Sequence, residues 1–184
     1  MRLYLIRHAI TPPTVPDSHL WPLSQEGEAQ SALLAQALFW DEVSALYSSP
    51  ESKGLSMVRP ASATHGLQIE EDERLRETRR PAKWIDDYDG AVRRYLEHPA
   101  DPPEEWEGAP DVRARMVECI GEISARHPQK AVALCGHGLA LALYLSSLPS
   151  FGGSVIDRRR SIGLAPVVEG GEKTTPFVDP SEGQ

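Results

Sequence analysis

The sequence contains little cysteine and no long apolar run. Its 2 cysteines, Cys119 and Cys135, are too few for a disulfide framework and are not spaced as metal ligands. We therefore expect a cytoplasmic protein with reduced thiols. No stretch reaches the ~18 apolar residues that a membrane-spanning helix requires. The N-terminus lacks the small-residue cleavage site of a signal peptide, so we interpret it as a strand.

Positive charge is also scarce. The chain has 19 Lys and Arg residues against 27 Asp and Glu residues, a formal net charge of -8 at pH 7. This balance excludes a nucleic-acid binder that works by bulk charge and argues against a basic membrane-surface protein. With 40% hydrophobic residues in 184, the chain can bury a globular core. We expect a single domain over 1–178 and a disordered tail over 179–184.

Short apolar runs alternate with longer helical patterns along the chain. Strands are predicted at 3–6, 43–47, 67–69 and 131–135, and helices at 24–40, from 49, at 87–98, from 111 and at 138–148. A hairpin is predicted from 161–168 and 174–178. This alternation predicts an α/β fold, a three-layer α/β/α sandwich around a mostly parallel central sheet. Ligands bind such sheets at the carboxyl ends of the strands.

Two histidines directly follow predicted strands. Arg7 and His8 come after the first strand, and His137 follows the fourth between Gly136 and Gly138. The planar fork of arginine matches phosphate oxygens, and a neutral imidazole is a competent nucleophile near pH 7. Helix N-termini also favour anions. Taken alone, Arg7 and His8 are better explained as a surface pair without a function, and His137 equally well as part of a tight strand-to-helix turn. Together, at one edge of a sheet, they indicate a phosphate site.

The stretch LYLIRHAIT resembles the N-terminal motif of the histidine phosphatase superfamily, whose members are also called phosphoglycerate mutase-like proteins. Later segments are similar to further motifs of that superfamily and follow in the same order. These motifs are Leu-Thr-x-x-Gly-x-x-Gln, Ser-Ser-Pro, the Leu-x-Glu acid motif and the second histidine motif, at 23–30, 47–50, 75–77 and 133–138. The resemblance spans 2–168 and implies the phosphoglycerate mutase-like α/β/α fold.

The resemblance also implies a role for each motif residue. His8 would be the nucleophile that forms a phosphohistidine, and Arg7 and His137 would bind the phosphoryl oxygens and stabilise their charge. Glu77 would protonate the leaving alkoxide and then act as a base toward water. The remaining phosphate-binding positions are Thr11, Thr14, Lys53 and Gly138. No metal ion and no cofactor is implied.

Glu77 also has a simpler interpretation. It lies in the charged run 70–80, and by position alone a solvated carboxylate explains it better. Its order and spacing relative to the other motifs favour the catalytic role. A carboxyl that donates a proton near neutral pH needs a raised pKa, and we expect desolvation to raise it.

Several positions depart from the superfamily pattern. Lys53 stands where an arginine is usual and keeps the charge without the bidentate fork, and Arg59 is a lower-ranked substitute. Met57 replaces a usual threonine, Ala9 a usual glycine, and Thr14 an asparagine that contacts phosphate in many members. These changes leave the predicted fold intact. They support an alternative of another class, a catalytically weak protein that binds a phospholigand.

The resemblance favours a metal-independent phosphatase that acts on a small phosphorylated substrate. A phosphoglycerate-type mutase is an alternative, although typical mutases are longer and carry extra substrate loops. A protein-phosphohistidine phosphatase is another, although those usually lack the Leu-x-Glu acid that Glu77 supplies. The sequence gives no prediction of the oligomeric state.

Two further segments bear on the substrate. A lid is predicted over 79–110, with four aromatic residues that we expect to pack it onto the core: Trp84, Tyr88, Tyr95 and Trp106. The basic run 158–160 is interpreted as a solvated loop or as a rim that guides an anionic substrate. His19 matches no motif and is interpreted as a surface residue. We expect an acidic outer surface around a locally positive phosphate site.

Overall fold

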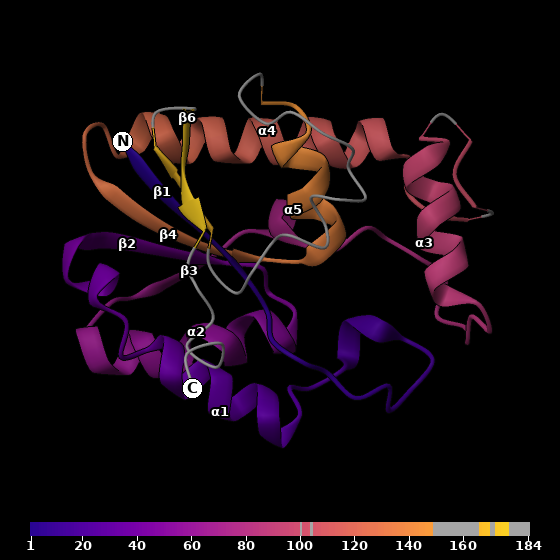
Figure 1. The fold of residues 1–184 in the computed structure, drawn as a ribbon, viewed down its shortest axis with the longest axis horizontal. Helices are drawn as coiled ribbons and strands as arrows, with labels where there is room; N and C mark the ends of the chain where they lie inside the picture. Colours follow the sequence, from indigo (N-terminus) through magenta and orange to yellow (C-terminus); the bar gives the residue numbers. More distant parts are fainter. Residues whose placement is uncertain (100, 104, 149–165, 170–171, 177–184) are drawn as a thin grey trace.

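In the computed structural model, which describes residues 1–99, 101–103, 105–148, 166–169 and 172–176, a central sheet separates two groups of helices (Figure 1). The strand order in this part of the chain is β3-β2-β4-β1-β5-β6. The basic run 158–160 and the tail predicted at 179–184 lie outside the described residues.

Four parallel strands form the body of the sheet, and a hairpin extends it beyond β1. The parallel strands are β1 (Arg2–Arg7), β2 (Val43–Ser48), β3 (Ile69–Glu71) and β4 (Ala131–Gly136). The hairpin consists of β5 (Pro166–Glu169), antiparallel to β1, and β6 (Glu172–Pro176). The prediction of a mostly parallel sheet with a final hairpin is therefore confirmed.

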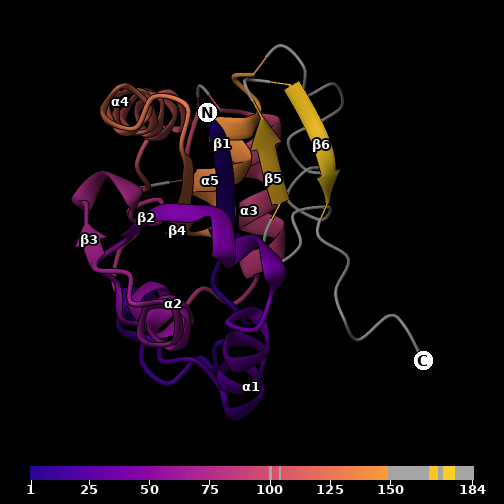
Figure 2. The same ribbon diagram turned by 90° about the vertical axis from the view of Figure 1, so that its left-hand side faces the viewer.

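Helices cover both faces of the sheet (Figures 1 and 2). One face carries α1 (Gln25–Leu34) and α2 (Ser52–His65). The other carries α3 (Tyr88–Glu97), α4 (Ala109–Arg126) and α5 (Gly138–Leu145). The predicted three-layer α/β/α sandwich is confirmed. Among the helices described, none is long and apolar enough to cross a membrane.

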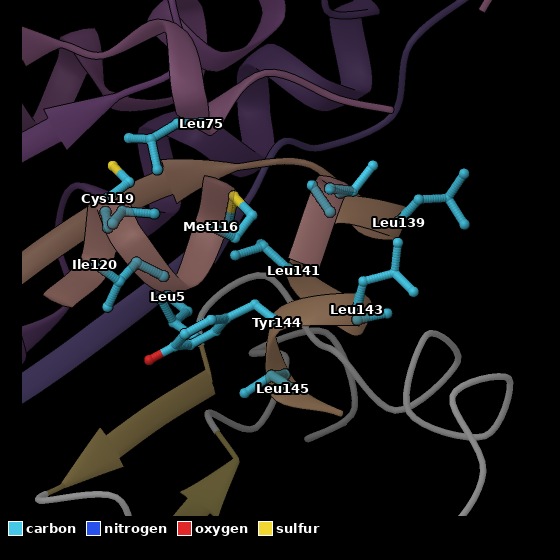
Figure 3. Close-up of a cluster of buried hydrophobic side chains, with 14 of the residues drawn as sticks. Leu5, Leu75, Met116, Cys119, Ile120, Leu139, Leu141, Leu143, Tyr144 and Leu145 are labelled. Atoms are coloured by element: carbon cyan, nitrogen blue, oxygen red, sulfur yellow. The ribbon is translucent and has the colours of Figure 1, made fainter. Parts of the chain in front are cut away.

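The apolar residues of β1 are buried because they contribute to two hydrophobic cores, one on each face of the sheet. Successive strand residues point to opposite faces. Leu3 and Leu5 belong to the hydrophobic core on the side of α4 and α5, where Leu141 also lies (Figure 3). Tyr4 and Ile6 belong to the second core, on the side of α1 and α2. A strand buried on both faces reads as a continuous apolar run rather than an alternating one.

Two helix boundaries differ from the prediction. The helix predicted over 24–40 ends at Leu34, where the buried indole N–H of Trp40 donates a hydrogen bond to the Leu34 carbonyl at 2.8 Å. The chain then continues as a short 3₁₀ turn. The second helix begins at Ser52, with Glu51 rather than Ser49 in the capping position. The Ser49 hydroxyl instead accepts the Glu51 N–H at 3.2 Å.

The parallel strands end together at one edge of the sheet. In the register of the ladder Arg7 pairs with Gly136, and Ser48 pairs with Cys135. The residues that follow these three strands therefore enter the same region, although they are far apart in sequence. Every motif predicted to contact phosphate from a strand end meets at this edge.

Candidate active site

The strand register places the two motif histidines beside each other. His8 donates its backbone N–H to the Gly136 carbonyl at 3.3 Å, directly before His137. The ring centroids of His8 and His137 are 5.1 Å apart. Two imidazoles, one following β1 and one following β4, thus lie beside each other at one edge of the sheet, as the sequence predicts.

His8 is oriented and neutral. Its Nδ1 lies 2.8 Å from the Ala9 carbonyl oxygen, an acceptor only, so Nδ1 carries the proton and Nε2 has the free lone pair. Burial lowers the pKa of His8 to about 4, and the charges of Lys53 and Arg7 lower it as well. At neutral pH the imidazole is therefore unprotonated at Nε2. This is the form in which histidine is a nucleophile.

His137 is completely buried. Its Nε2 lies 2.8 Å from the Ser49 hydroxyl and 3.5 Å from Oε1 of Glu51. Its Nδ1 is also buried and has no hydrogen-bond partner among the described residues. Burial lowers the pKa of His137 to about 3, so the ring is neutral at pH 7. The nitrogen without a partner can bind a further polar atom, such as a phosphoryl oxygen.

The Glu77 carboxylate lies at the N-terminus of α5. Backbone N–H groups of Thr78, Leu139 and Ala140 donate to it at 2.9, 3.2 and 3.0 Å. It is buried and not part of a solvated charge run, so the simpler interpretation from the sequence is wrong. A carboxylate at a helix N-terminus is stabilised by the free N–H groups and the helix dipole.

The expected rise in the pKa of Glu77 is not found. Burial alone would raise this pKa, but His137, the guanidinium of Arg80 and the backbone N–H groups outweigh burial and lower it. The expectation considered desolvation and missed these donors. Glu77 is accordingly ionised at neutral pH in this structure.

A cavity of about 250 Å³ opens between these groups. It is lined by six of the eight residues predicted for the site: Arg7, His8, Thr11, Lys53, Glu77 and Gly138. The other two do not line it: His137 is completely buried, and Thr14 is exposed. Other lining residues were not predicted, notably Ser18, Trp21, Arg80 and Tyr88. We call this space the phosphate cavity.

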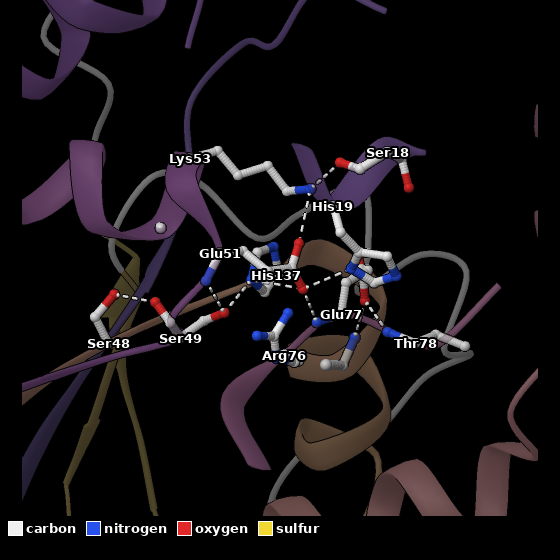
Figure 4. A network of polar contacts seen from close by, with 12 residues as sticks. Ser18, His19, Ser48, Ser49, Glu51, Lys53, Arg76, Glu77, Thr78 and His137 are labelled. Atoms are coloured by element: carbon white, nitrogen blue, oxygen red, sulfur yellow. Dashed lines mark hydrogen bonds and ion pairs between the residues drawn. The ribbon is translucent and has the colours of Figure 1, made fainter. Parts of the chain in front are cut away.

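An unpredicted carboxylate, Glu51, lies at the centre of the polar network (Figure 4). It is buried, and its oxygens lie 2.9 Å from Nζ of Lys53 and 3.0 Å from Nδ1 of His19. It also accepts the backbone N–H of Glu77 at 2.8 Å. Burial would raise the pKa of Glu51, but His19, His137 and Lys53 lower it well below its usual range.

Lys53 and His19 both depend on this carboxylate. Lys53 is buried at 3% exposure, and its Nζ also donates to the Ser18 carbonyl at 2.6 Å. His19, interpreted from the sequence as a surface residue, is half-buried against Glu51, so that interpretation is wrong. Only the position of Glu51 after the Ser-Ser-Pro motif, two residues before Lys53, hinted at its role.

Arg115 of α4 holds the acid motif in place. Its guanidinium donates to the carbonyl oxygens of Arg76 at 2.9 Å and Glu77 at 3.2 Å. The same group binds Glu107 at 2.9 Å. The segment carrying Glu77 has no regular secondary structure, so these bonds replace the support that a helix would give. Nothing local in the sequence points to Arg115.

The segment 79–110, the predicted lid, packs only partly onto the core. Tyr95 and Trp106 are buried as expected, whereas Trp84 is 57% exposed. The Arg80 guanidinium lies 4.8 Å from the ring centroid of Tyr88 and 5.5 Å from that of Trp106. It donates to the Ser18 hydroxyl at 2.6 Å. Arg80 thereby joins this segment to the loop that follows β1.

No group of three or more His, Cys, Asp or Glu side chains in the described part of the chain is arranged to hold a metal ion. The positive charges at the phosphate cavity come from Arg7, Lys53 and Arg80. These side chains are suited to bind an anion.

Solved structures share this fold at low sequence identity. YhfR of Bacillus stearothermophilus superposes with a TM-score of 0.76 at 23% identity, over 97% of this chain and 96% of its own. A mycobacterial glucosyl-3-phosphoglycerate phosphatase gives 0.72 at 23% identity over 90% and 87%. The alpha-ribazole phosphatase of Shigella flexneri gives 0.73 at 19% identity over 97% and 96%.

Comparison by sequence identifies the family. No curated protein sequence matches the chain significantly. A sequence model of the histidine phosphatase superfamily (branch 1) matches residues 3–164, which include both histidine motifs, Lys53 and Glu77. This chain therefore belongs to the histidine phosphatase superfamily.

Proposed function

We propose that the protein is a phosphatase that hydrolyses a small phosphomonoester through a phosphohistidine on His8, without a metal ion. The observation that carries this proposal is the unprotonated Nε2 of a neutral His8, in one cavity with Arg7, Lys53 and Glu77. A nucleophile, anion-binding cations and a carboxyl for proton transfer are the groups that this reaction needs.

In the first step Nε2 of His8 attacks phosphorus and the bond to the leaving oxygen breaks. Arg7, Lys53 and His137 bind the phosphoryl oxygens and stabilise their charge during transfer. Glu77 gives a proton to the leaving alkoxide. Glu77 is ionised in this structure. A bound phosphoryl dianion brings like charge close to it and raises its pKa, which favours the protonated form that the step requires.

In the second step a water molecule attacks the phosphohistidine. Glu77, now a carboxylate, takes a proton from that water, and the bond from phosphorus to Nε2 breaks. His8 returns as a neutral imidazole, because its hydrogen bond to Ala9 keeps the proton on Nδ1. Two proteins of similar structure, a glucosyl-3-phosphoglycerate phosphatase and an alpha-ribazole phosphatase, support hydrolysis of a small phosphorylated substrate.

One observation favours a second candidate function. Lys53 is paired with the Glu51 carboxylate, so part of its charge is neutralised before any phosphate arrives. A site weakened in this way could bind a phospholigand without turning it over. This second candidate is the catalytically weak phospholigand-binding protein that lysine in place of arginine at position 53 supports.

The deciding experiment is an assay with p-nitrophenyl phosphate in the presence of a chelator. We expect chelator-resistant turnover that falls by at least about 10³-fold in His8→Ala. His98→Ala, which alters an exposed histidine outside the cavity, is the matched control and should retain full activity. Acid-labile label from a ³²P substrate should appear on the wild-type protein and not on His8→Ala.

Three results would count against the proposal. If His8→Ala retains activity, His8 is not the nucleophile. If the chelator abolishes activity, the reaction requires a metal ion. No turnover of any phosphomonoester, with tight binding of inorganic phosphate, would favour the weak phospholigand-binding protein.

A further inference from the structure

A second cavity, of about 360 Å³, opens beside the phosphate cavity. The two share four lining residues, namely Ser18, Trp21, Arg80 and Tyr88. The remaining wall is mostly apolar and consists of Pro13, Pro16, Pro81, Trp84 and Ile85, with Lys83 as its additional charged residue. We call this space the apolar cavity.

The apolar cavity is formed by the segments that follow the two groups proposed to react, His8 and Glu77. Its walls come from two segments, the loop after β1 and the start of segment 79–110. The first segment follows the nucleophile His8 and the second follows the proton donor Glu77. In the proposed mechanism the leaving oxygen must reach Glu77, which lines the phosphate cavity together with Arg80 and Tyr88. These two side chains also line the apolar cavity.

The polar groups that border the apolar cavity are already engaged. Arg80 donates to the Ser18 hydroxyl and stacks on Tyr88. The Trp21 indole N–H donates to the Val15 carbonyl at 2.6 Å. A polyhydroxylated group placed here would exchange hydrogen bonds with water for few new ones, which is unfavourable.

Apolar surface, in contrast, is available there. Trp84 is 57% exposed, although tryptophan is rarely left uncovered in a folded domain. A ligand ring placed against Trp84, Ile85 and the prolines would remove apolar area from water, and ring contacts add to that gain.

We propose that the apolar cavity binds the alcohol part of the substrate, so that the protein prefers phosphomonoesters of aromatic or otherwise apolar alcohols. This inference rests on the proposed phosphatase function and names its substrate class. The phosphate cavity holds the phosphoryl group, and the apolar cavity selects what is attached to it.

The first test measures binding without turnover. Dissociation constants of 2-phenylethylphosphonate and methylphosphonate are determined by calorimetry on the full chain. Neither compound has a P–O–C bond to hydrolyse, so the comparison does not depend on catalysis. We expect the phenylethyl compound to bind about 10-fold more tightly or better. Equal affinities would overturn the proposal.

The second test compares turnover of 2-phenylethyl phosphate and glycerol 1-phosphate. Both release an alkoxide, so their intrinsic reactivities are similar. We expect kcat/KM to favour the phenylethyl ester by roughly 10- to 100-fold. Turnover of both esters with equal kcat/KM would reject the apolar preference and leave the phosphatase function standing. Turnover of neither, with the phosphonate preference intact, would reject the phosphatase function and retain the apolar cavity as a ligand site.

A matched pair of variants locates the effect. Trp84→Ala should reduce the phenylethyl preference, in binding and in kcat/KM, by roughly 5-fold. Because the side chain is mostly exposed, the variant should fold normally. Leu38→Ala removes an 86% exposed apolar side chain that lines neither cavity and should leave the preference unchanged. A preference that survives Trp84→Ala in full would contradict the assignment.

Discussion

The phosphate cavity and the apolar cavity adjoin each other but are built differently. In the first, His8 follows β1, Lys53 lies in the first turn of α2 and the Glu77 carboxylate lies at the start of α5, and each of these three is held by hydrogen bonds or an ion pair. The second is formed by two connecting segments and includes an exposed tryptophan. The difference follows from the forces involved. Charged groups that are removed from water stabilise a ligand only when they are held in fixed positions. Apolar contacts have no preferred direction, so less rigid segments can make them.

This contrast predicts where substitutions are costly. Changes in the phosphate cavity should affect chemistry or folding strongly, because they leave buried polar groups without partners. Changes in the apolar cavity should alter the choice of substrate and little else. The following predictions test that division, in order of decreasing effect.

The largest effect is expected for Glu77→Gln. We expect single-turnover formation of phosphohistidine from an alkyl phosphate to slow by about 10²- to 10⁴-fold, because the alkoxide then leaves without a proton. The same step with p-nitrophenyl phosphate should change much less, since p-nitrophenolate is a stable anion. Rapid-quench measurements with both substrates check this. Equal slowing of both would show that Glu77 does not donate the proton.

The second prediction compares an ion pair beside each cavity. Glu51→Gln leaves Lys53 buried without its carboxylate and should lower the free energy of unfolding by about 3 kcal/mol. Glu105→Gln removes the partner of Lys83 in a pair whose side chains are 56% and 61% exposed, and should cost less than about 1 kcal/mol. Urea denaturation of both variants gives the values. If both substitutions lower the free energy of unfolding by similar amounts, the proposed difference between the two cavities is wrong.

The third prediction concerns pH. The pKa values of His8 and His137 are about 4 and about 3 in the folded protein, below the ordinary value of 6.5. The unfolded chain therefore binds more protons as pH falls below 6.5, and stability is lost toward pH 4. From pH 7 to pH 5 we expect each of the two histidines to contribute a loss of roughly 2 kcal/mol to the free energy of unfolding, which urea denaturation measures. In His8→Gln the pH dependence should be weaker. If the free energy of unfolding of His8→Gln depends on pH as steeply as that of the wild type, groups other than His8 cause the pH dependence.

The smallest effect is expected for Lys53→Arg, which introduces the residue usual in the superfamily. Nζ of Lys53 lies between Glu51 and the Ser18 carbonyl, a space suited to a compact ammonium group. We expect kcat/KM for p-nitrophenyl phosphate to fall roughly 2- to 5-fold. Arg59→Lys on the exposed part of the same helix is the control and should have no effect. An increase in kcat/KM for Lys53→Arg would mean that arginine is accommodated after all.

The sequence predicted the features that depend on local pattern. Buried strands, their parallel arrangement and the residues that follow them can be recognised from apolar runs and spacing, and the rule for strand ends then brings His8 and His137 together. Arg7, Thr11, Lys53 and Gly138 line the cavity for the same reason.

Features that depend on long-range contacts could not be predicted. Arg115 reaches the carbonyl of Glu77 from 38 positions away, and Glu51 is buried only because partners from other segments surround it. The pKa of Glu77 was misjudged because His137, which lowers it most, and two of its three backbone donors, Leu139 and Ala140, lie about 60 positions further along the chain. The site residues were thus predictable, but the groups that orient and charge them were not.

The Glu51 carboxylate joins two functions through a single side chain. It receives the backbone N–H of Glu77 and at the same time holds Lys53. Positions 51 and 53 are therefore expected to be epistatic. The effect of arginine at 53 should differ between proteins that keep and lack the carboxylate at 51, because a buried cation at 53 loses its ionic partner when that carboxylate is removed.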